Sequence, residues 1–128
     1  MSKQVVRTEN APAAVGAYSQ GIIANGFVFT AGQVPLIPGT KDLAEGGIKG
    51  QSRQARENIK GVLEASGSSL ASVVKTTVFL DNINDFADFN AVYSEFFTAN
   101  PPARSTVQVG KLPLGALVEI EAVALIES

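Results

Sequence analysis

This sequence of 128 residues contains no cysteine and no histidine. Without cysteine the chain can form no disulfide and has no thiolate nucleophile, a composition that fits a reducing compartment. Because both residue types are missing, a serine–histidine triad is impossible and a transition-metal site is not expected. Any chemical site must therefore be built from Arg, Glu, Tyr, Ser, Thr and backbone groups.

Charged residues are also scarce. They make up 17% of the chain, hydrophobic residues make up 45%, and the net charge is −2. A net negative charge has the wrong sign for non-specific binding to nucleic acid or to an anionic membrane. The length fits one domain spanning residues 1–128. A surface so poor in charge suggests that part of it is covered by another subunit.

Long hydrophobic runs are absent as well. No window approaches the roughly 18 apolar residues of a membrane-spanning helix, and the N-terminal segment lacks the apolar centre of a signal peptide. Lys3 and Arg7 are followed at once by Glu9, unlike the composition of a transit peptide. We expect a cytoplasmic protein, with a mitochondrial location as the second alternative.

Local patterns in the first two thirds of the chain predict a hairpin, a helix and a strand. Asn25-Gly26 is the preferred pair for a two-residue type I′ turn, so residues 18–24 and 27–33 are predicted to form a hairpin. Apolar residues at helical spacing predict a helix over residues 48–66. The β-branched run over residues 73–80 predicts a strand.

A second helix and two further strands are predicted to follow. Asn84 has the character of an N-cap, and Asn100-Pro101-Pro102 is expected to end the helix. Strands are predicted over residues 104–109 and 117–126. The aromatic residues of this helix are interpreted as core rather than as a cofactor site. They are Phe86, Phe89, Tyr93, Phe96 and Phe97.

This order of elements predicts an α+β sandwich, a mixed sheet with two helices on one face. In the last strand Val118 and every second residue after it are apolar and should face the helices. The other face carries Glu119 and Glu121 among apolar residues, which suits a subunit interface lined with a polar site. Arg104 and Thr106 share one face of the preceding strand. If the faces match across the sheet, Arg104 and Glu119 can both lie on the side away from the helices.

Arg104, a nearby glutamate and a tyrosine can form a chemical site. An arginine fork binds a carboxylate through two parallel hydrogen bonds. A glutamate can take a proton from water as the water attacks an electrophilic carbon, and a tyrosine supplies an apolar wall. Such a site would suit addition of water to a small 2-oxo or 2-imino acid. The alternative is that Arg104 forms only a structural salt bridge with Glu119 or Glu121.

Several stretches of the sequence, in order along the chain, resemble a known family. They are Ala11-Pro12-Ala13-Ala14, Gly16-Ala17-Tyr18-Ser19-Gln20-Gly21, Ala31-Gly32-Gln33-Val34-Pro35, Val74-Lys75-Thr76-Thr77-Val78-Phe79, Asn90-x-x-Tyr93-x-x-Phe96-Phe97, Pro102-Ala103-Arg104-Ser105, Leu112-Pro113 and Glu119-Ile120-Glu121-Ala122. Across essentially the whole chain they resemble the YjgF/RidA family, the reactive intermediate/imine deaminases.

The resemblance implies a chorismate-mutase-like fold and a homotrimer with clefts between subunits. It also implies cofactor-independent hydrolysis of 2-iminopropanoate, its enamine 2-aminoacrylate and 2-iminobutanoate, which PLP-dependent dehydratases release and which damage PLP enzymes. The family's carboxylate-binding arginine falls on Arg104, the glutamate associated with the attacking water on Glu119, and the cleft tyrosine on Tyr18. Asn90 falls on a further position near the cleft.

The sequence departs from the family pattern at two positions of the implied site. Ala31 stands where archetypal members carry a serine, and Thr106 stands where some members carry a cysteine. The sequence leaves two other functions open. One is a trimer that binds 2-oxo acids without turnover or acts like a chaperone, because similar folds can bind without catalysing. The other is a nuclease or translation inhibitor, against which the acidic balance and the missing histidine count.

Overall fold

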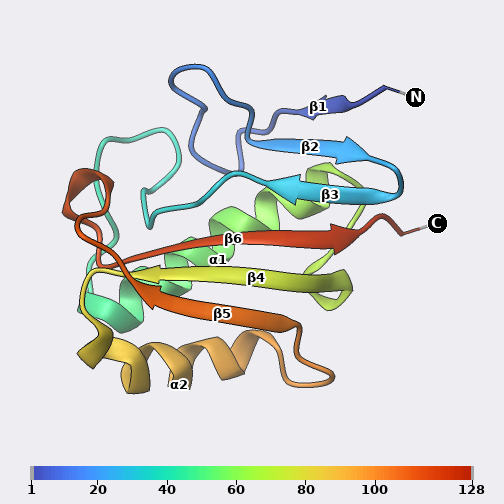
Figure 1. The fold of residues 1–128 in the computed structure, drawn as a ribbon. Helices are drawn as coiled ribbons and strands as arrows, with labels where there is room; N and C mark the ends of the chain where they lie inside the picture. The colour runs from blue at the N-terminus through green and yellow to red at the C-terminus, as the bar shows by residue number, and fades with distance from the viewer. Residues whose placement is uncertain (1, 128) are drawn as a thin grey trace.

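The computed structural model describes residues 2–127, which form one sheet and two α-helices (Figure 1). The strands are β1 (Gln4–Val6), β2 (Gly21–Ala24), β3 (Phe27–Thr30), β4 (Val73–Leu80), β5 (Ala103–Gln108) and β6 (Val118–Leu125). The helices are α1 (Gly47–Ala65) and α2 (Phe86–Phe96), with short 3₁₀ turns η1 (Leu70–Ser72), η2 (Ile83–Asp85) and η3 (Pro113–Gly115). The predicted α+β architecture is therefore confirmed.

The strands follow the order β1-β2-β3-β6-β4-β5 in a six-stranded sheet. Strands β4 and β5 pair in parallel, whereas the other neighbours are antiparallel, so the sheet is mixed as predicted. A parallel pair needs a crossover connection, and α2 supplies it along the β5 edge (Figure 1). Neither α-helix of the described chain is long and apolar enough to cross a membrane.

The β2–β3 hairpin turns at Asn25-Gly26, as the sequence predicts. Asn25 has a φ of 53° and Gly26 a φ of 83°, the positive values that a type I′ turn needs at both central residues. Helix α1 and β4 also begin and end within one residue of their predicted bounds. Local sequence patterns were therefore sufficient to predict these elements.

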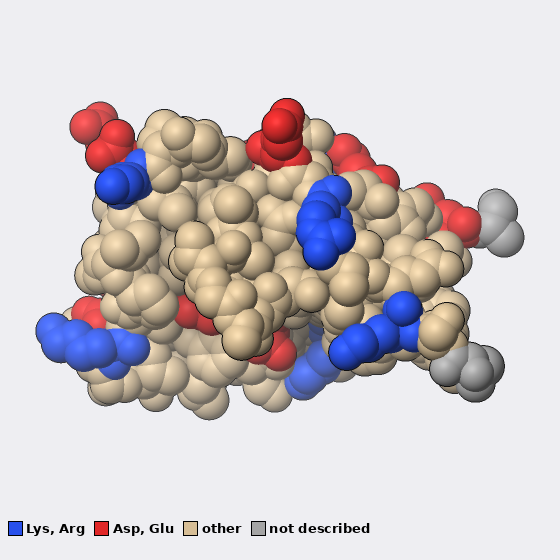
Figure 2. All heavy atoms as spheres, turned by 90° about the horizontal axis from the view of Figure 1, so that it is seen from above, with Lys and Arg blue, Asp and Glu red and all other residues tan. Residues whose placement is uncertain are grey.

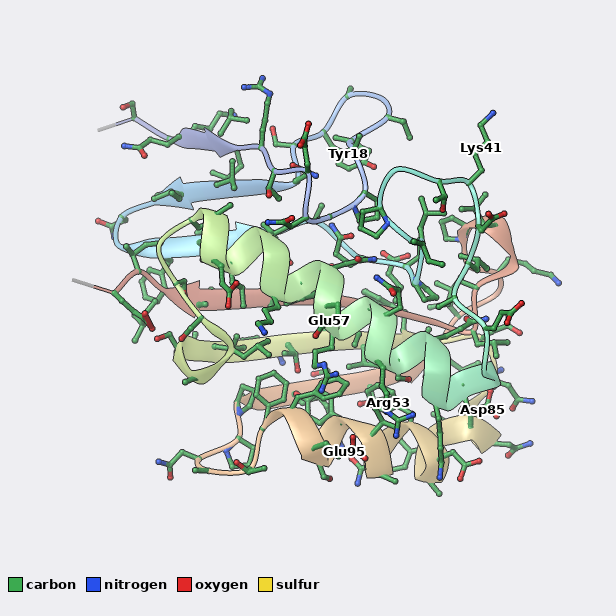
Figure 3. The ribbon with its side chains drawn as sticks, turned by 180° about the vertical axis from the view of Figure 1, so that it is seen from behind. Tyr18, Lys41, Arg53, Glu57, Asp85 and Glu95 are labelled. Carbon is green, nitrogen blue, oxygen red and sulfur yellow. The ribbon has the colours of Figure 1, made fainter. Side chains whose placement is uncertain are left out.

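The core lies between the sheet and α1. In β6 the side chains of Val118, Ile120, Ala122 and Ala124 are buried on this face, as predicted. Arg53 of α1 and Glu95 of α2 form an ion pair of 3.5 Å across the helix pair, and Figure 3 shows them facing each other.

No element of the described chain covers the opposite face of the sheet (Figure 1). Val5, Phe29, Val107 and Leu125 lie there, each 44–45% exposed, on β1, β3, β5 and β6. An apolar sheet face of this width is typical of a surface that another chain covers.

Helix α2 differs from its prediction at both ends. The turn η2 precedes it, and the Asn82 side chain caps η2 by accepting from the Asn84 N–H at 2.9 Å. The predicted cap at Asn84 is therefore wrong, and Asp85 precedes α2 without a side-chain capping bond. Asn82 has the extended backbone that a cap requires, which sequence alone does not reveal. The helix ends at Phe96, before Asn100, because Phe97 leaves the helical conformation and packs its ring 4.9 Å from that of Tyr93.

Two buried amide side chains hold the long loops at one end of the sheet. The Gln20 amide donates to the carbonyl oxygens of Thr8, Ala11 and Pro12 at 3.0, 3.2 and 2.8 Å. The Asn58 amide of α1 donates to two carbonyl oxygens of the segment 34–36, at 3.0 and 2.8 Å. Buried carbonyl groups are thereby satisfied, and the backbone next to residues 18–20 and 31–33 is fixed.

Candidate functional site

Arg104 lies on the edge strand β5 and faces the helix-covered side of the sheet. It pairs with Thr76 of β4, and Thr76 pairs with Ala122 of β6, which is buried beneath the helices. Side chains directly opposite each other on neighbouring strands share a face. The condition under which Arg104 and Glu119 could both lie away from the helices is therefore not met. The prediction that alternate side chains of β5 point to opposite faces was correct. Which of the two faces carries Arg104 and Thr106 is decided by the register of β5 with β4.

Helix α2 holds the Arg104 side chain through three residues. The Nη1 group of Arg104 donates to Asn90 Oδ1 at 2.8 Å. The guanidinium carbon lies 4.7 Å from the Tyr93 ring centroid and 5.3 Å from that of Phe86. Each cation–π contact contributes about 0.5–1 kcal/mol when partly exposed. We call Phe86, Asn90, Tyr93 and Arg104 the arginine cluster.

The guanidinium of Arg104 has no acidic partner. Within residues 2–127 no carboxylate lies within 4.0 Å of it, so the predicted alternative of a salt bridge with Glu119 or Glu121 is wrong for a single chain. A cavity of about 330 Å³ opens beside it. The cavity is lined by Asn90, Tyr93, Ser94, Phe97, Pro101, Pro102 and Arg104. A half-buried, uncompensated cation at a cavity is suited to binding an anion.

Thr106 lies two residues beyond Arg104 on the same face of β5, opposite Val78. Residues at this spacing are roughly 7 Å apart. The Thr106 hydroxyl is buried and has no hydrogen-bond partner among the described residues. An unpaired buried hydroxyl costs about 1–3 kcal/mol, so this group is available to a neighbouring ligand or chain.

Glu119 lies on β6 and faces the uncovered side of the sheet. It pairs with Phe79 and is half-buried. A side chain on Gly32 would collide with the Glu119 carboxylate, so the carboxylate lies directly against the Gly32 backbone. Burial raises the pKa of Glu119 above its ordinary value, and the negative charge of Glu121 raises it further. We call Gly32, Glu119 and Glu121 the glutamate cluster.

Ala31 borders the glutamate cluster, since it precedes Gly32. Its N–H donates to the Gln20 carbonyl oxygen at 2.9 Å, and its side chain is half-buried. A serine at this position would add a hydroxyl next to Gly32. The alanine leaves only backbone polar groups there.

Tyr18 lies near the other edge of the sheet, in the loop before β2. It is 51% exposed, and its hydroxyl accepts from the Val15 N–H at 3.3 Å. Figure 3 shows Tyr18 on the opposite side of α1 from Glu95 of α2. Four strand spacings separate β2 from β5, roughly 20 Å. Tyr18 and Arg104 of one chain therefore cannot contact the same small molecule.

The structure thus brings Asn90, Arg104 and Thr106 together and leaves Glu119, Ala31 and Tyr18 elsewhere. Sequence reasoning missed Tyr93 and Phe86 as Arg104 partners, because it assigned both to the core. One signal was available: Phe86, Asn90 and Tyr93 follow at intervals of four and three residues, which places them on one helix face.

Charge is spread thinly over the surface seen in Figure 2. Lys and Arg side chains form small separate groups between uncharged atoms, and Asp and Glu lie among them. This view shows no continuous basic stripe of the kind that follows a nucleic-acid backbone. No three acidic side chains of residues 2–127 lie close enough together to hold a metal ion.

Comparisons with known proteins find similar sequences and structures along nearly the whole chain. The sequence profile of the family described as Endoribonuclease L-PSP matches residues 8–126. The chain is 48% identical to the 2-iminobutanoate/2-iminopropanoate deaminase of Salmonella typhimurium, covering 98% of each chain. The structure superposes on YyfA of Yersinia pestis, a Rid family protein, with a TM-score of 0.93 and 47% identity over 98% of this chain and 100% of that one. It also superposes on Escherichia coli TdcF with bound serine, with a TM-score of 0.91 and 40% identity over 97% and 99% of the two chains.

Proposed function

This chain belongs to the YjgF/RidA family, and from that premise we propose that it hydrolyses small 2-imino acids to 2-oxo acids and ammonia. The substrates would be 2-iminopropanoate, its enamine 2-aminoacrylate, and 2-iminobutanoate. The observation that carries the proposal is the Arg104 guanidinium, which α2 holds in place at a cavity without any acidic partner in the described chain. The name of the Salmonella relative supports the reaction class.

The proposed reaction needs one cation, one base and one water. The Arg104 guanidinium binds the substrate carboxylate through two N–H groups. The ionised Glu119 takes a proton from water as the water oxygen attacks the carbon of the C=N bond. Glu119 returns this proton to the imine nitrogen, which becomes an amine, and the product is a carbinolamine. Glu119 then takes the hydroxyl proton of the carbinolamine and passes it to the nitrogen, so that the C=O bond forms as the C–N bond breaks and ammonia leaves.

Arg104 and Glu119 of one chain cannot serve one substrate. They lie on opposite faces of the sheet, with β4 between their strands, so that about 10 Å of sheet width also separates them. We therefore propose that the site is shared between copies in a homotrimer. The β5 edge of one chain would meet the glutamate cluster and Tyr18 of another. The uncovered apolar face of the sheet supports this assembly.

The proposed physiological role follows from the chemistry of the substrates. Reactive imines and enamines of this size are the products that PLP-dependent dehydratases release, and they inactivate PLP enzymes. A cytoplasmic deaminase would limit that damage. The reaction as written uses water and side chains alone, so we propose that it proceeds without a cofactor.

A binding-only function is the competing candidate. One observation favours it: within a single chain the anion-binding group is complete, whereas the proposed base lies on the opposite face of the sheet. Such a protein would bind 2-oxo or amino acids without accelerating hydrolysis. The endoribonuclease of the family description receives no comparable support, since the chain lacks histidine and carries a net charge of −2.

A coupled assay tests the proposal. A threonine dehydratase generates 2-iminobutanoate, and semicarbazide traps the imine that survives. We expect the wild-type protein to lower the trapped product in proportion to its concentration. Arg104→Ala should reduce kcat/KM by roughly 10²- to 10⁴-fold, because two charge-assisted hydrogen bonds are lost. Arg104→Lys should lose nearly as much, since lysine cannot form the bidentate pair.

Ser94→Ala is the matched control, since Ser94 lines the same cavity and bonds only to the Asn90 carbonyl oxygen of its own helix. Equal protection by wild type and Arg104→Ala would refute the deaminase mechanism. Binding of 2-oxobutanoate without any acceleration of imine loss would establish the binding-only function instead.

A further inference from the structure

The Tyr93 side chain connects Arg104 to the core. Its ring lies 4.7 Å from the Arg104 guanidinium carbon, and its hydroxyl is hydrogen-bonded to Thr76 Oγ1 at 2.6 Å. Tyr93 is 5% exposed and Thr76 only 1% exposed. Thr76 is also the residue that pairs with Arg104 across the parallel β4–β5 ladder. Arg104, Tyr93 and Thr76 therefore form a connected set of contacts that links β4, β5 and α2.

These contacts restrain the Arg104 side chain, which would otherwise be flexible. An arginine at the edge of a sheet has no second neighbouring strand against which to pack, and its many rotamers must be limited by other contacts. The Tyr93 ring can limit them only if the ring itself is fixed, and the bond to Thr76 fixes it. Burial raises the pKa of the Tyr93 phenol, so the hydroxyl stays neutral and adds no charge that would compete for Arg104.

We infer that Tyr93, held by Thr76, is a positioning residue that presents the Arg104 guanidinium to the carboxylate of the ligand. Asn90 accepts from Nη1, and a guanidinium carries five N–H donors, so enough donors remain to pair with both oxygens of a carboxylate. The inference rests on the proposed function, because it assumes that the ligand's carboxylate binds at Arg104. Tyr93 itself takes no part in bond making or breaking.

Two conservative variants test the role of the hydroxyl. Tyr93→Phe keeps the ring and removes the hydroxyl, and Thr76→Val keeps the shape of the threonine and removes its partner. Titration of the full-length protein with 2-oxobutanoate should show roughly fivefold weaker binding for each variant. The double variant should bind no more weakly than either single variant, since both changes break the same bond.

Ser68→Ala provides the matched control. It also removes a short hydroxyl bond, 2.6 Å to the Leu125 carbonyl oxygen, but at a site away from β5 and α2. It should lower the melting temperature without changing the affinity. Unchanged affinity in both Tyr93→Phe and Thr76→Val would overturn the inference, as would losses that add in the double variant.

A ligand-independent measurement separates this inference from the proposed function. In the wild type, the NMR signals of the Arg104 guanidinium should show hindered rotation, and in Tyr93→Phe and Thr76→Val they should show faster rotation. If wild type and Arg104→Ala bind 2-oxobutanoate equally, the proposed role of Arg104 fails, yet the NMR signals still decide the positioning. Guanidinium signals that are identical in all three proteins would overturn it.

Discussion

The arginine cluster and the glutamate cluster are constructed in opposite ways. The restraints on Arg104 come from its own chain: it donates a hydrogen bond to Asn90, it contacts two aromatic rings, and one of these, Tyr93, is bonded into the core. Glu119 accepts no hydrogen bond from any described residue and rests against the backbone of Gly32 on the uncovered face. The arginine cluster is therefore held in place by contacts within the chain, whereas the glutamate cluster has few such contacts and faces the uncovered side of the sheet.

This difference indicates what the proposed assembly would contribute. A single chain already has the geometry to hold an anion, because the cation is fixed and unpaired. Under the proposed mechanism it cannot deliver an activated water to that anion, because its own glutamate is on the other face of the sheet. The proposal therefore predicts that binding and catalysis can be separated, with the assembled form required only for catalysis.

Mixed oligomers give the largest expected effect. Oligomers of Arg104→Ala alone or of Glu119→Gln alone should be nearly inactive. In a random equal mixture within a cyclic trimer, about a quarter of the shared sites should receive Arg104 from one chain and Glu119 from its neighbour. Activity in the coupled assay should therefore rise to about a quarter of the wild-type value, measured on mixed oligomers purified after co-expression.

The same experiment can refute the shared site. If both residues of each site came from one chain, every site in the mixture would lack one of them, and the mixed oligomers would be as inactive as their parents. Mixing the two proteins after separate purification, without exchange of subunits, serves as the control and should give no recovery.

Gly32→Ala should produce the next largest effect, since it alters the glutamate cluster alone. The added methyl group would occupy the position of the Glu119 carboxylate and force it to move. We expect roughly a tenfold loss of kcat with little change in 2-oxobutanoate affinity, because Arg104 is untouched. Gly110→Ala is the matched control: a Cβ there meets no atom within 4 Å. Weaker ligand binding in Gly32→Ala would show that the two clusters are not independent.

Much of the fold was accessible from the sequence because it depends on local patterns. The Asn25-Gly26 turn needs positive φ at two residues, and few other pairs tolerate this. The alternation of buried and exposed side chains in β6 follows from the period of a strand and places Glu119 on the outer face without any structure.

The side to which Arg104 points could not be deduced in this way. Alternation assigns Arg104 and Thr106 to one face of β5, but the choice between two faces depends on the register with β4, across a helical crossover. An arginine is also unexpected on the helix side. It is tolerated there because β5 is an edge strand, and because Asn90 and Tyr93 satisfy its polar and cationic character.

The smallest expected effect is a shift in the pH dependence of kcat/KM, which tests whether Glu119 is the base. A base must be ionised to accept a proton, so kcat/KM should fall on the acid side as pH drops through the pKa of Glu119. Burial and the charge of Glu121 both raise this pKa above the ordinary 4.5. The fall of kcat/KM on the acid side of the pH profile, the acid limb, should therefore lie at higher pH than for an exposed glutamate. Glu121→Gln removes the second cause and leaves the first.

The acid limb of Glu121→Gln should therefore shift slightly to lower pH, and it should still lie above 4.5 because burial is the larger cause. Glu64→Gln removes the same charge from an exposed position on α1 and should leave the limb unchanged. The same profile should be recorded for 2-oxobutanoate affinity, which depends on Arg104 and should not follow the limb. A shift to higher pH in Glu121→Gln would contradict Glu119 as the titrating base. A limb that moves equally in both variants would reflect net charge rather than the contact between the two glutamates.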